Sequence, residues 1–188
     1  MTIKVITAPQ AEPISLSEAK LHLRVDTDAD DTLITGLITA ARMKVEELSW
    51  HALITQTLEL VLDEWPCEDE IELPRPPLQS VTYVTYRMSD GTVTTLDPSL
   101  YVVAGDSIPA EIEPAYMHTW PTVVLYPVEA IRVRYVCGFG LTGKDVPQVL
   151  RQAMLLTLAF LYENRESGAG LPGAVDMLCV NYRKKVMR

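Results

Sequence analysis

The sequence has few cysteines and few histidines. Its three cysteines, Cys67, Cys137 and Cys179, are far apart and odd in number, which argues against a disulfide framework and predicts reduced, mostly buried thiols. The three histidines are equally scattered, so no Cys or His pair has the close spacing of a structural zinc site. We therefore expect neither a metal nor a cofactor.

Long apolar runs are also lacking, although 48% of the residues are hydrophobic. No uninterrupted run reaches the ~18 residues that a membrane span requires. The opening MTIKVITAPQAEP has a lysine but no continuous apolar stretch behind it, which argues against a secretory signal. These features predict a globular protein that is synthesised in the cytoplasm and has no membrane partner.

Positive charge is scarce in the first part of the chain. Residues 1–73 hold 15 acidic and 5 basic side chains, whereas residues 74–188 hold 10 acidic and 11 basic ones, for a net charge of −9 overall. Such a surface repels a phosphate backbone, because affinity for nucleic acids comes largely from Lys and Arg displacing counterions. The balance therefore argues against sequence-specific DNA binding.

Apolar residues recur at helical spacing near both ends of the chain. Ser15 and Glu18 have the spacing of a capping box before a short helix that ends near Arg24. A longer apolar stripe predicts a helix over 31–48, and another that is apolar nearly all round predicts one from Pro147 to Glu166. Pro172 suits the first turn of a last helix that reaches Val186.

The middle of the chain changes to a period of two, which is typical of strands. The alternation over 54–62 predicts a half-buried strand. Asp90-Gly91 supplies the positive backbone angles of a tight hairpin turn, and frequent prolines restrict the strands to short pieces. Further strands are expected at 71–73, 81–88, 92–96, 100–103 and 130–137.

Together these patterns predict an α+β fold. The amino- and carboxyl-terminal helices should pack together as a helical core, with a β-rich insert of short antiparallel strands between them. The expected boundaries are 1–52 for the amino-terminal part of the core, 53–140 for the insert and 141–188 for the carboxyl-terminal part of the core.

The segment from Gly138 to Asp145 resembles a nucleotide-binding loop. GFGLTGKD fits the dinucleotide spacing GxGxxG and nearly fits the phosphate-loop spacing GxxxxGK[ST]. However, Asp145 replaces the hydroxyl that would ligate magnesium, and Pro147 starts the next helix too late for its amino end to reach the phosphates. No later strand completes a βαβ unit. We favour a structural connection and keep a nucleotide-binding enzyme that uses Gly138 to Lys144 as the alternative.

No other frame for catalysis is present. No Ser, Cys or His lies in a GxSxG elbow or a similar arrangement. The acidic stretch 64–72 surrounds Trp65-Pro66 and is expected to be a solvated loop rather than a pair of catalytic carboxylates. We predict no catalytic, cofactor-binding or metal-binding residues, and therefore no enzyme.

Several strings occur in a definite order along the chain. They are ISLSEAKLHLRVD, DDTLITGLITAARMKVEE, ALITQTLEL, IELPRPPLQSV, SDGTVTTLDPSLYVV, IRVRYVCGFG and VPQVLRQAMLLTLAFLYENRE. Their order and spacing resemble the head-tail connector (head completion or adaptor) family of tailed bacteriophages. The resemblance covers nearly the whole chain and is weakest at 111–128, where only Trp120-Pro121 matches.

The resemblance implies a structural subunit of a ring between the portal vertex of the DNA-filled head and the tail. The implied partners are further copies of the chain, with a dodecamer as one candidate size, the portal protein, and the tail or a second head-completion protein. DNA would pass through the ring without specific contacts. The implied location is the head-tail junction of the virion, and another tail-completion or scaffolding role is the alternative.

The last residues concentrate positive charge in an otherwise acidic protein. They are expected either to dock on the portal or merely to complement the dipole of their own helix. The residues concerned are Arg183, Lys184, Lys185 and Arg188.

Overall fold

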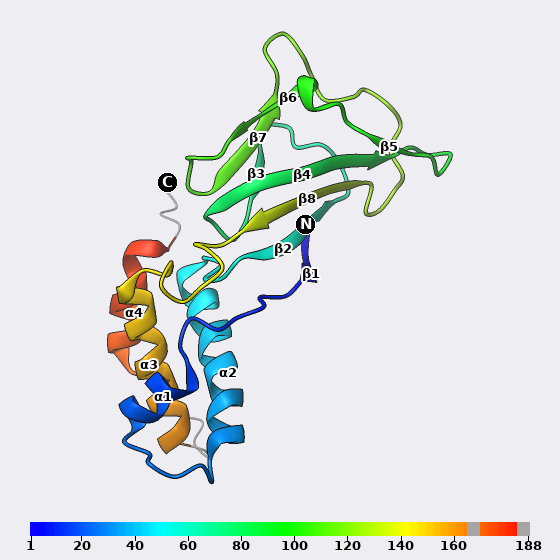
Figure 1. The fold of residues 1–188 in the computed structure, drawn as a ribbon. Coiled ribbons are helices and arrows are strands. Elements are labelled where there is room, and N and C mark those ends of the chain that lie inside the picture. The colour runs from blue at the N-terminus through cyan, green and yellow to red at the C-terminus, as the bar shows by residue number, and fades with distance from the viewer. Residues whose placement is uncertain (165–169, 184–188) are drawn as a thin grey trace. The chain divides into compact units, whose positions relative to one another are not determined.

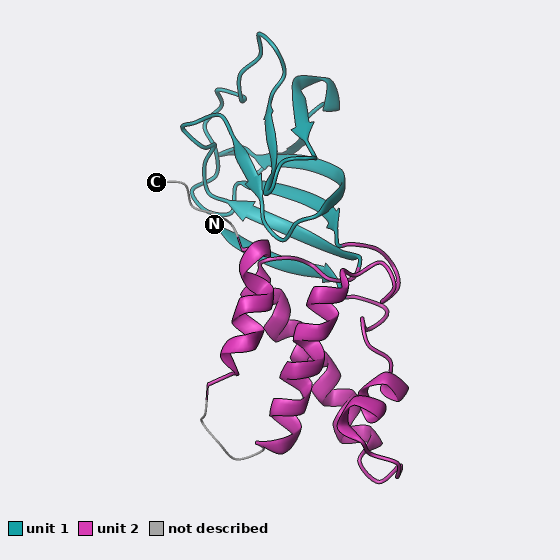
Figure 2. Ribbon diagram, turned by 90° about the vertical axis from the view of Figure 1, so that its left-hand side faces the viewer, with its two compact units in different colours: residues 1–8, 55–138 teal, residues 9–54, 139–188 magenta. Residues whose placement is uncertain are grey.

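A computed structural model describes residues 1–164 and 170–183. The chain forms two compact units, each assembled from segments that are distant in the sequence (Figure 2). The strand unit (unit 1) comprises residues 1–8 and 55–138, and the helical unit (unit 2) comprises residues 9–54 and 139–188. The predicted α+β class with antiparallel sheets is confirmed.

The helical unit begins with α1 (Leu16–Leu23), which is stabilised by the predicted capping box. The backbone N–H of Glu18 donates to Ser15 Oγ at 3.2 Å, and the N–H of Ser15 donates to Glu18 Oε2 at 2.9 Å. These bonds satisfy two amide groups that the start of a helix leaves without partners. Arg24 ends the helix in the left-handed conformation, with φ 57°.

Three further helices complete this unit. They are α2 (Asp31–Ser49), α3 (Gln148–Glu163) and α4 (Gly173–Cys179), the last followed by a 3-10 turn at Val180–Tyr182. The last helix is shorter than predicted, and Val186 lies outside the described residues. None of the helices among residues 1–164 and 170–183 is long and apolar enough to span a membrane.

The core of the helical unit contains residues from both ends of the chain. The prediction that the helices near residues 31–48 and 147–166 share one core is confirmed, because their apolar stripes belong to the same buried cluster. An isolated helix cannot bury its own apolar stripe, so each of the two segments depends on the other for burial. The fully buried members include Ile34, Ala41 and Val45 of α2, Leu150, Met154 and Leu158 of α3, and Val175 of α4.

The strand unit contains a five-stranded antiparallel sheet in the order β1-β2-β8-β4-β5 (Figure 1). Its strands are β1 (Thr2–Thr7), β2 (Gln56–Leu62), β8 (Ile131–Cys137), β4 (Leu78–Arg87) and β5 (Val93–Thr95). One face is apolar and buried, with Leu60, Val133 and Tyr135 fully enclosed.

A second, three-stranded sheet belongs to the same unit. Its order is β3 (Ile71–Leu73), β7 (Ala110–Pro114) and β6 (Tyr101–Ala104), and a 3-10 turn at Pro98–Leu100 precedes β6. The buried Tyr135 of the larger sheet donates its hydroxyl to the carbonyl of Pro74, directly after β3, at 2.8 Å.

Two strands differ from the sequence prediction. Thr2–Thr7, which was expected in the amino-terminal helical part of the core, forms strand β1 and pairs with β2. Its side chains are mostly exposed because it lies at the sheet edge. The alternation of Ile3 and Val5 with Lys4 was a signal for this strand that the sequence prediction did not use. Strand β7 was missed because only Ala110 and Ile112 are buried and prolines stand at 109 and 114.

The hairpin between β4 and β5 lies where it was predicted, but its turn does not have positive φ angles at both Asp90 and Gly91. Only Gly91 of the Asp90-Gly91 pair has a positive φ, of 90°. Asp90 contributes through its carboxylate, which accepts the backbone N–H of Thr92 at 2.8 Å. Short polar side chains often stabilise turns in this way.

Candidate interaction surfaces

A row of polar side chains crosses four strands of the five-stranded sheet. In the strand register, Lys4 lies opposite Glu59, Glu59 lies opposite Arg134, and Arg134 lies opposite Tyr83. Residues that are directly opposite one another in neighbouring strands point to the same face of a sheet. The four side chains therefore lie together on the face opposite Leu60 and Val133.

Glu59 is the buried centre of this row. Its side chain is only 3% exposed, and its two oxygens accept hydrogen bonds from Arg132 at 3.1 Å and from Arg134 at 2.7 Å. The hydroxyl of Tyr83 also donates to it, at 3.2 Å. Burial, followed by the charge of Glu59, raises the pKa of Tyr83. A buried carboxylate is tolerated because it is paired and hydrogen-bonded.

The row continues to the rim of the sheet through Glu129. Its carboxylate pairs with Lys4 at 3.0 Å and with Arg132 at 2.9 Å, and its backbone N–H donates to Asp63 at 2.8 Å. Arg132 therefore links the buried Glu59 to the exposed Glu129.

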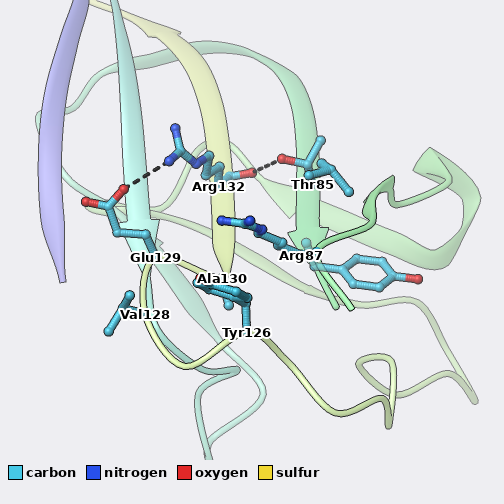
Figure 3. Close-up of a pocket in the computed structure, with 10 residues that line it drawn as sticks. Thr85, Arg87, Tyr126, Val128, Glu129, Ala130 and Arg132 are labelled. Carbon is cyan, nitrogen blue, oxygen red and sulfur yellow. Dashed lines mark hydrogen bonds and ion pairs between the residues drawn. The ribbon is translucent and has the colours of Figure 1, made fainter. Parts of the chain in front are cut away.

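Beside this row lies a pocket of about 340 Å³, here called the Arg87 pocket (Figure 3). The guanidinium carbon of Arg87 lies 3.8 Å from the ring centroid of Tyr126, which is a cation–π contact. Thr85 and Arg132 line the wall, and Val93 and Val128 line the rim. The pocket thus combines a positive charge with apolar surface.

An acidic segment, residues 64–72, leads from β2 into β3. Trp65 stacks on Trp120 with ring centroids 4.7 Å apart, and the indole N–H of Trp120 donates to the carbonyl of Asp69 at 3.2 Å. Glu68, Asp69 and Glu70 are exposed, as the prediction of a solvated loop requires. The charge of Glu111 is the main cause that raises the pKa of Glu70, with burial and the charges of Glu113, Glu68 and Glu72 adding to it.

The Gly138 to Lys144 loop has a packing reason for its glycines. A Cβ on Gly143 would lie 2.2 Å from the carbonyl oxygen of Pro13, so only glycine fits there. Thr142 donates both its backbone N–H and its hydroxyl to Asp145 at 2.9 Å, and these bonds lower the pKa of that carboxyl. The loop's own carboxylate therefore occupies an amide that a phosphate would need, which favours the structural interpretation.

The thiols and the other candidate ligands are dispersed. Cys137 and Cys179 are buried, and Cys67 is exposed. Within residues 1–164 and 170–183, no three His, Cys, Asp or Glu side chains form a group that could hold a metal ion.

Arg183 is the described member of the basic carboxyl-terminal group. Its guanidinium pairs with Asp176 at 2.5 Å and donates to the carbonyl of Leu48 at 3.0 Å. It is therefore bound to its own helical unit. Lys184, Lys185 and Arg188 lie outside the described residues.

The comparisons with known proteins agree with one another. Residues 13–92 match the family model of phage gp6-like head-tail connector proteins. The whole structure resembles a chain in the neck of an empty gene transfer agent (GTA) particle computed with C6 symmetry, at 25% identity and a TM-score of 0.84, covering 100% of this chain and 98% of that one. The resemblance to phage head-tail connectors is confirmed.

Further matches extend this finding. A chain in the neck of the native GTA particle, computed with C12 symmetry, has the same identity of 25%, TM-score of 0.84 and coverage of 100% and 98%. A chain in the virion of the native GTA particle matches at 24% identity and a TM-score of 0.83, with coverage of 100% and 98%. No curated protein matches the sequence. The connector family and the solved neighbours are thus structural components of phage-like particles.

The polar row centred on Glu59 was not predicted from the sequence. Glu59 was assigned only as a polar position of a half-buried strand. The available signal was the alternation of Arg132 and Arg134 with apolar residues in IRVRYVC, which places two positive charges on one face of a strand.

Proposed function

We propose that this chain is a structural, non-enzymatic subunit of a head-tail connector ring in a phage or phage-like particle. The ring would join the portal vertex of the DNA-filled head to the tail or to the next completion protein. The observation that carries this proposal is the likeness of the entire chain to a chain in a GTA neck solved with C12 symmetry, at a TM-score of 0.84. Twelve copies is the size that this symmetry favours, since C6 symmetry is contained within it.

A symmetry argument and the charge of the chain support this role. A contact between two different surfaces generates a closed ring when its rotation closes, whereas a self-complementary contact stops at a dimer. The net charge of −9 would disfavour adhesion of DNA to the ring while the genome passes through it.

Particle assembly tests the proposal directly. Particles produced without this chain should package DNA but carry no tails, and supplying the chain should restore the tails, as counted by electron microscopy. Native mass spectrometry of the chain, alone and with portal, should show one large closed species. Tailed particles without the chain, or a strict two-fold dimer in every condition, would contradict the proposal.

We further propose that the basic end of the chain docks on the portal. Arg183 serves its own helical unit, so the docking group is Lys184, Lys185 and Arg188. Each ring would repeat the contact many times, and weak single attachments would then add up through effective concentration.

A deletion that begins at residue 184 separates docking from folding, because it retains the bonds of Arg183 to Asp176 and Leu48. The melting temperature should change little, while co-sedimentation with portal rings should be lost or become strongly salt-sensitive. Replacing the three basic residues by Gln controls for chain length. Unchanged portal binding at physiological salt would reject the docking role.

A further inference from the structure

The Arg87 pocket contains a cation that has no ion-pair partner in the described part of the chain. Among residues 1–164 and 170–183, no carboxylate forms an ion pair with Arg87, and its side chain contacts the ring face of Tyr126 instead. By contrast, Arg132 in the same pocket pairs with Glu59 and Glu129. Arg87 thus offers its guanidinium to a further acceptor.

The surroundings of Arg87 are typical of a protein contact. Val93 and Val128 on the rim are 63% and 59% exposed, respectively. An arginine on an aromatic ring, next to apolar side chains that a partner could cover, is the combination enriched at interaction hot spots.

The same unit carries unneutralised negative charge on the acidic segment. Glu68 and Glu70 are exposed, and neither forms an ion pair with a described Lys or Arg. The other acidic tract is partly neutralised, since Asp28 and Asp31 both pair with Lys20, at 2.6 and 2.7 Å. Of these two tracts, the acidic segment is therefore the better source of carboxylates for the Arg87 pocket.

The two features lie on opposite faces of the five-stranded sheet. Arg132 and Thr85, which line the Arg87 pocket, are paired across β8 and β4 and share the face of Arg134 and Glu59. Glu68 and Glu70 line a hollow of about 260 Å³ together with Leu60 and Leu62, which alternate with Glu59 along β2. One copy therefore presents the pocket on one face and the acidic segment toward the other.

We propose that the Arg87 pocket of one copy receives the acidic segment of the next copy, with Arg87 pairing to Glu68 or Glu70. This inference rests on the proposed ring, for which it supplies the contact between subunits. Because the two surfaces differ and lie on opposite faces, the contact is heterologous and can repeat around a ring.

DNA is the other partner that a positive pocket could contact. The chain is acidic overall, with a net charge of −9, which disfavours contact with a phosphate backbone. The acidic segment also carries Trp65 and Pro66 beside its carboxylates, and these side chains suit the valine rim better than a phosphate backbone does.

Charge reversal in the full-length protein tests the contact. At low ionic strength and high protein concentration, sedimentation velocity should show self-association of the wild type, weakened by about tenfold or more in Arg87→Glu. Glu68→Lys/Glu70→Lys changes only exposed side chains, so it should fold normally and lose association to a similar extent. Lys144→Glu is the control, because it reverses one exposed charge in the helical unit.

Mixing the variants gives the decisive measurement. Arg87→Glu and Glu68→Lys/Glu70→Lys should associate with each other, because every contact joins opposite charges when the two variants alternate. The triple variant in a single chain should associate with itself. Such mutual rescue would not follow from a general loss of stability.

Three outcomes would overturn the inference. They are a wild type that stays monomeric at low salt, association that persists in both reversed variants, and an Arg87→Glu variant that loses binding to a DNA duplex but keeps self-association. The proposed function is judged separately by the tails of particles made without the chain, so rings that ignore Arg87 would reject only this contact.

Discussion

The helical unit and the strand unit both bury apolar side chains, but they differ in whether a charge lies at their centre. The centre of the helical unit is apolar, with Ile34, Leu150 and Leu158 completely enclosed. The middle of the five-stranded sheet instead holds a buried carboxylate, Glu59, between two arginines. We therefore expect the core of the helical unit to respond to lost volume, and the polar face of the five-stranded sheet to respond to lost charge.

The helical unit also contains buried charge, but in a different role. Arg42 pairs with Glu12 at 2.8 Å and with Glu46 at 3.0 Å, and Glu46 accepts the backbone N–H of Leu53 at 2.9 Å. These groups hold the segments before and after α2 to that helix. Ion pairs thus attach loops to a helix in the helical unit, whereas they link neighbouring strands in the strand unit.

The largest expected effect is the loss of volume at Leu158. Leu158→Ala should lower the free energy of unfolding by ~2 to 5 kcal/mol, because it leaves a cavity in a fully buried core. Leu21→Ala is the matched control, since Leu21 is 81% exposed on α1 and its truncation should cost less than about 0.5 kcal/mol. Denaturant unfolding measures both. Equal losses would contradict the assignment of the core.

Loss of charge at Glu59 is expected to have the next largest effect. Glu59→Gln should cost about 1 to 3 kcal/mol, because the buried group that pairs with both arginines loses its charge and one of its two acceptor oxygens becomes an NH₂ donor. The cost stays below that of a fully buried ion pair because the side chains of Arg132 and Arg134 remain 42% and 30% exposed.

Glu129→Gln sharpens this comparison. Glu129 carries the same charge on the same face, but its side chain is 49% exposed, so the substitution should cost only about 0 to 1 kcal/mol. If Glu59→Gln were no more damaging than Glu129→Gln, the buried carboxylate would not stabilise the sheet.

Two glycines of the helical unit test packing at a smaller scale. Gly143→Ala should cost about 1 to 3 kcal/mol because its Cβ would meet the carbonyl oxygen of Pro13. Gly36→Ala should instead stabilise the protein by about 0.5 to 1 kcal/mol, since nothing lies within 4 Å of a Cβ in the middle of α2. Thermal unfolding of the two variants should therefore shift in opposite directions. A Gly143→Ala variant as stable as the wild type, or more stable, would refute the close approach to Pro13.

Local patterns were enough to predict most of the elements. The stripe that predicted a helix over 31–48 corresponds to α2 at Asp31–Ser49, and the strand expected at 130–137 corresponds to β8 at Ile131–Cys137. Both are long and buried on a regular face, so tertiary packing reinforces the local period. The two missed strands are short of such support, because β1 is mostly exposed at the sheet edge and β7 is flanked by prolines.

The interaction surfaces could not be predicted in the same way. Glu59 meets Arg132 and Arg134 across separations of 73 and 75 residues, through a strand register that the sequence does not specify. Likewise, the glycine at 143 is required by Pro13, which is distant in the chain. Asp145 and Pro147 argued against a phosphate loop from the sequence alone, but the sequence could not supply the contact that needs the glycine.

The smallest expected effect concerns His51, a buried titratable side chain of the helical unit. The residue is only 5% exposed, its ring stacks on Phe139 with centroids 5.8 Å apart, and Nδ1 lies 2.9 Å from the carbonyl of Ser49. Burial lowers its pKa from the ordinary value of 6.5. The folded state therefore favours neutral imidazole more than the unfolded state does.

The sign of the pH dependence follows from this difference. Well above pH 6.5 the ring is neutral in both states and contributes no pH dependence, whereas as the pH falls through 6.5 the unfolded state gains the proton first. The free energy of unfolding should therefore decrease as the pH is lowered, by at most about 1.4 kcal/mol per pH unit from this group. Between pH 7 and 5, His51→Gln should show a flatter profile than the wild type in denaturant titrations, whatever its absolute stability. Parallel profiles would mean that the ring takes up its proton without unfolding, and that the apolar centre of the helical unit does not extend to His51.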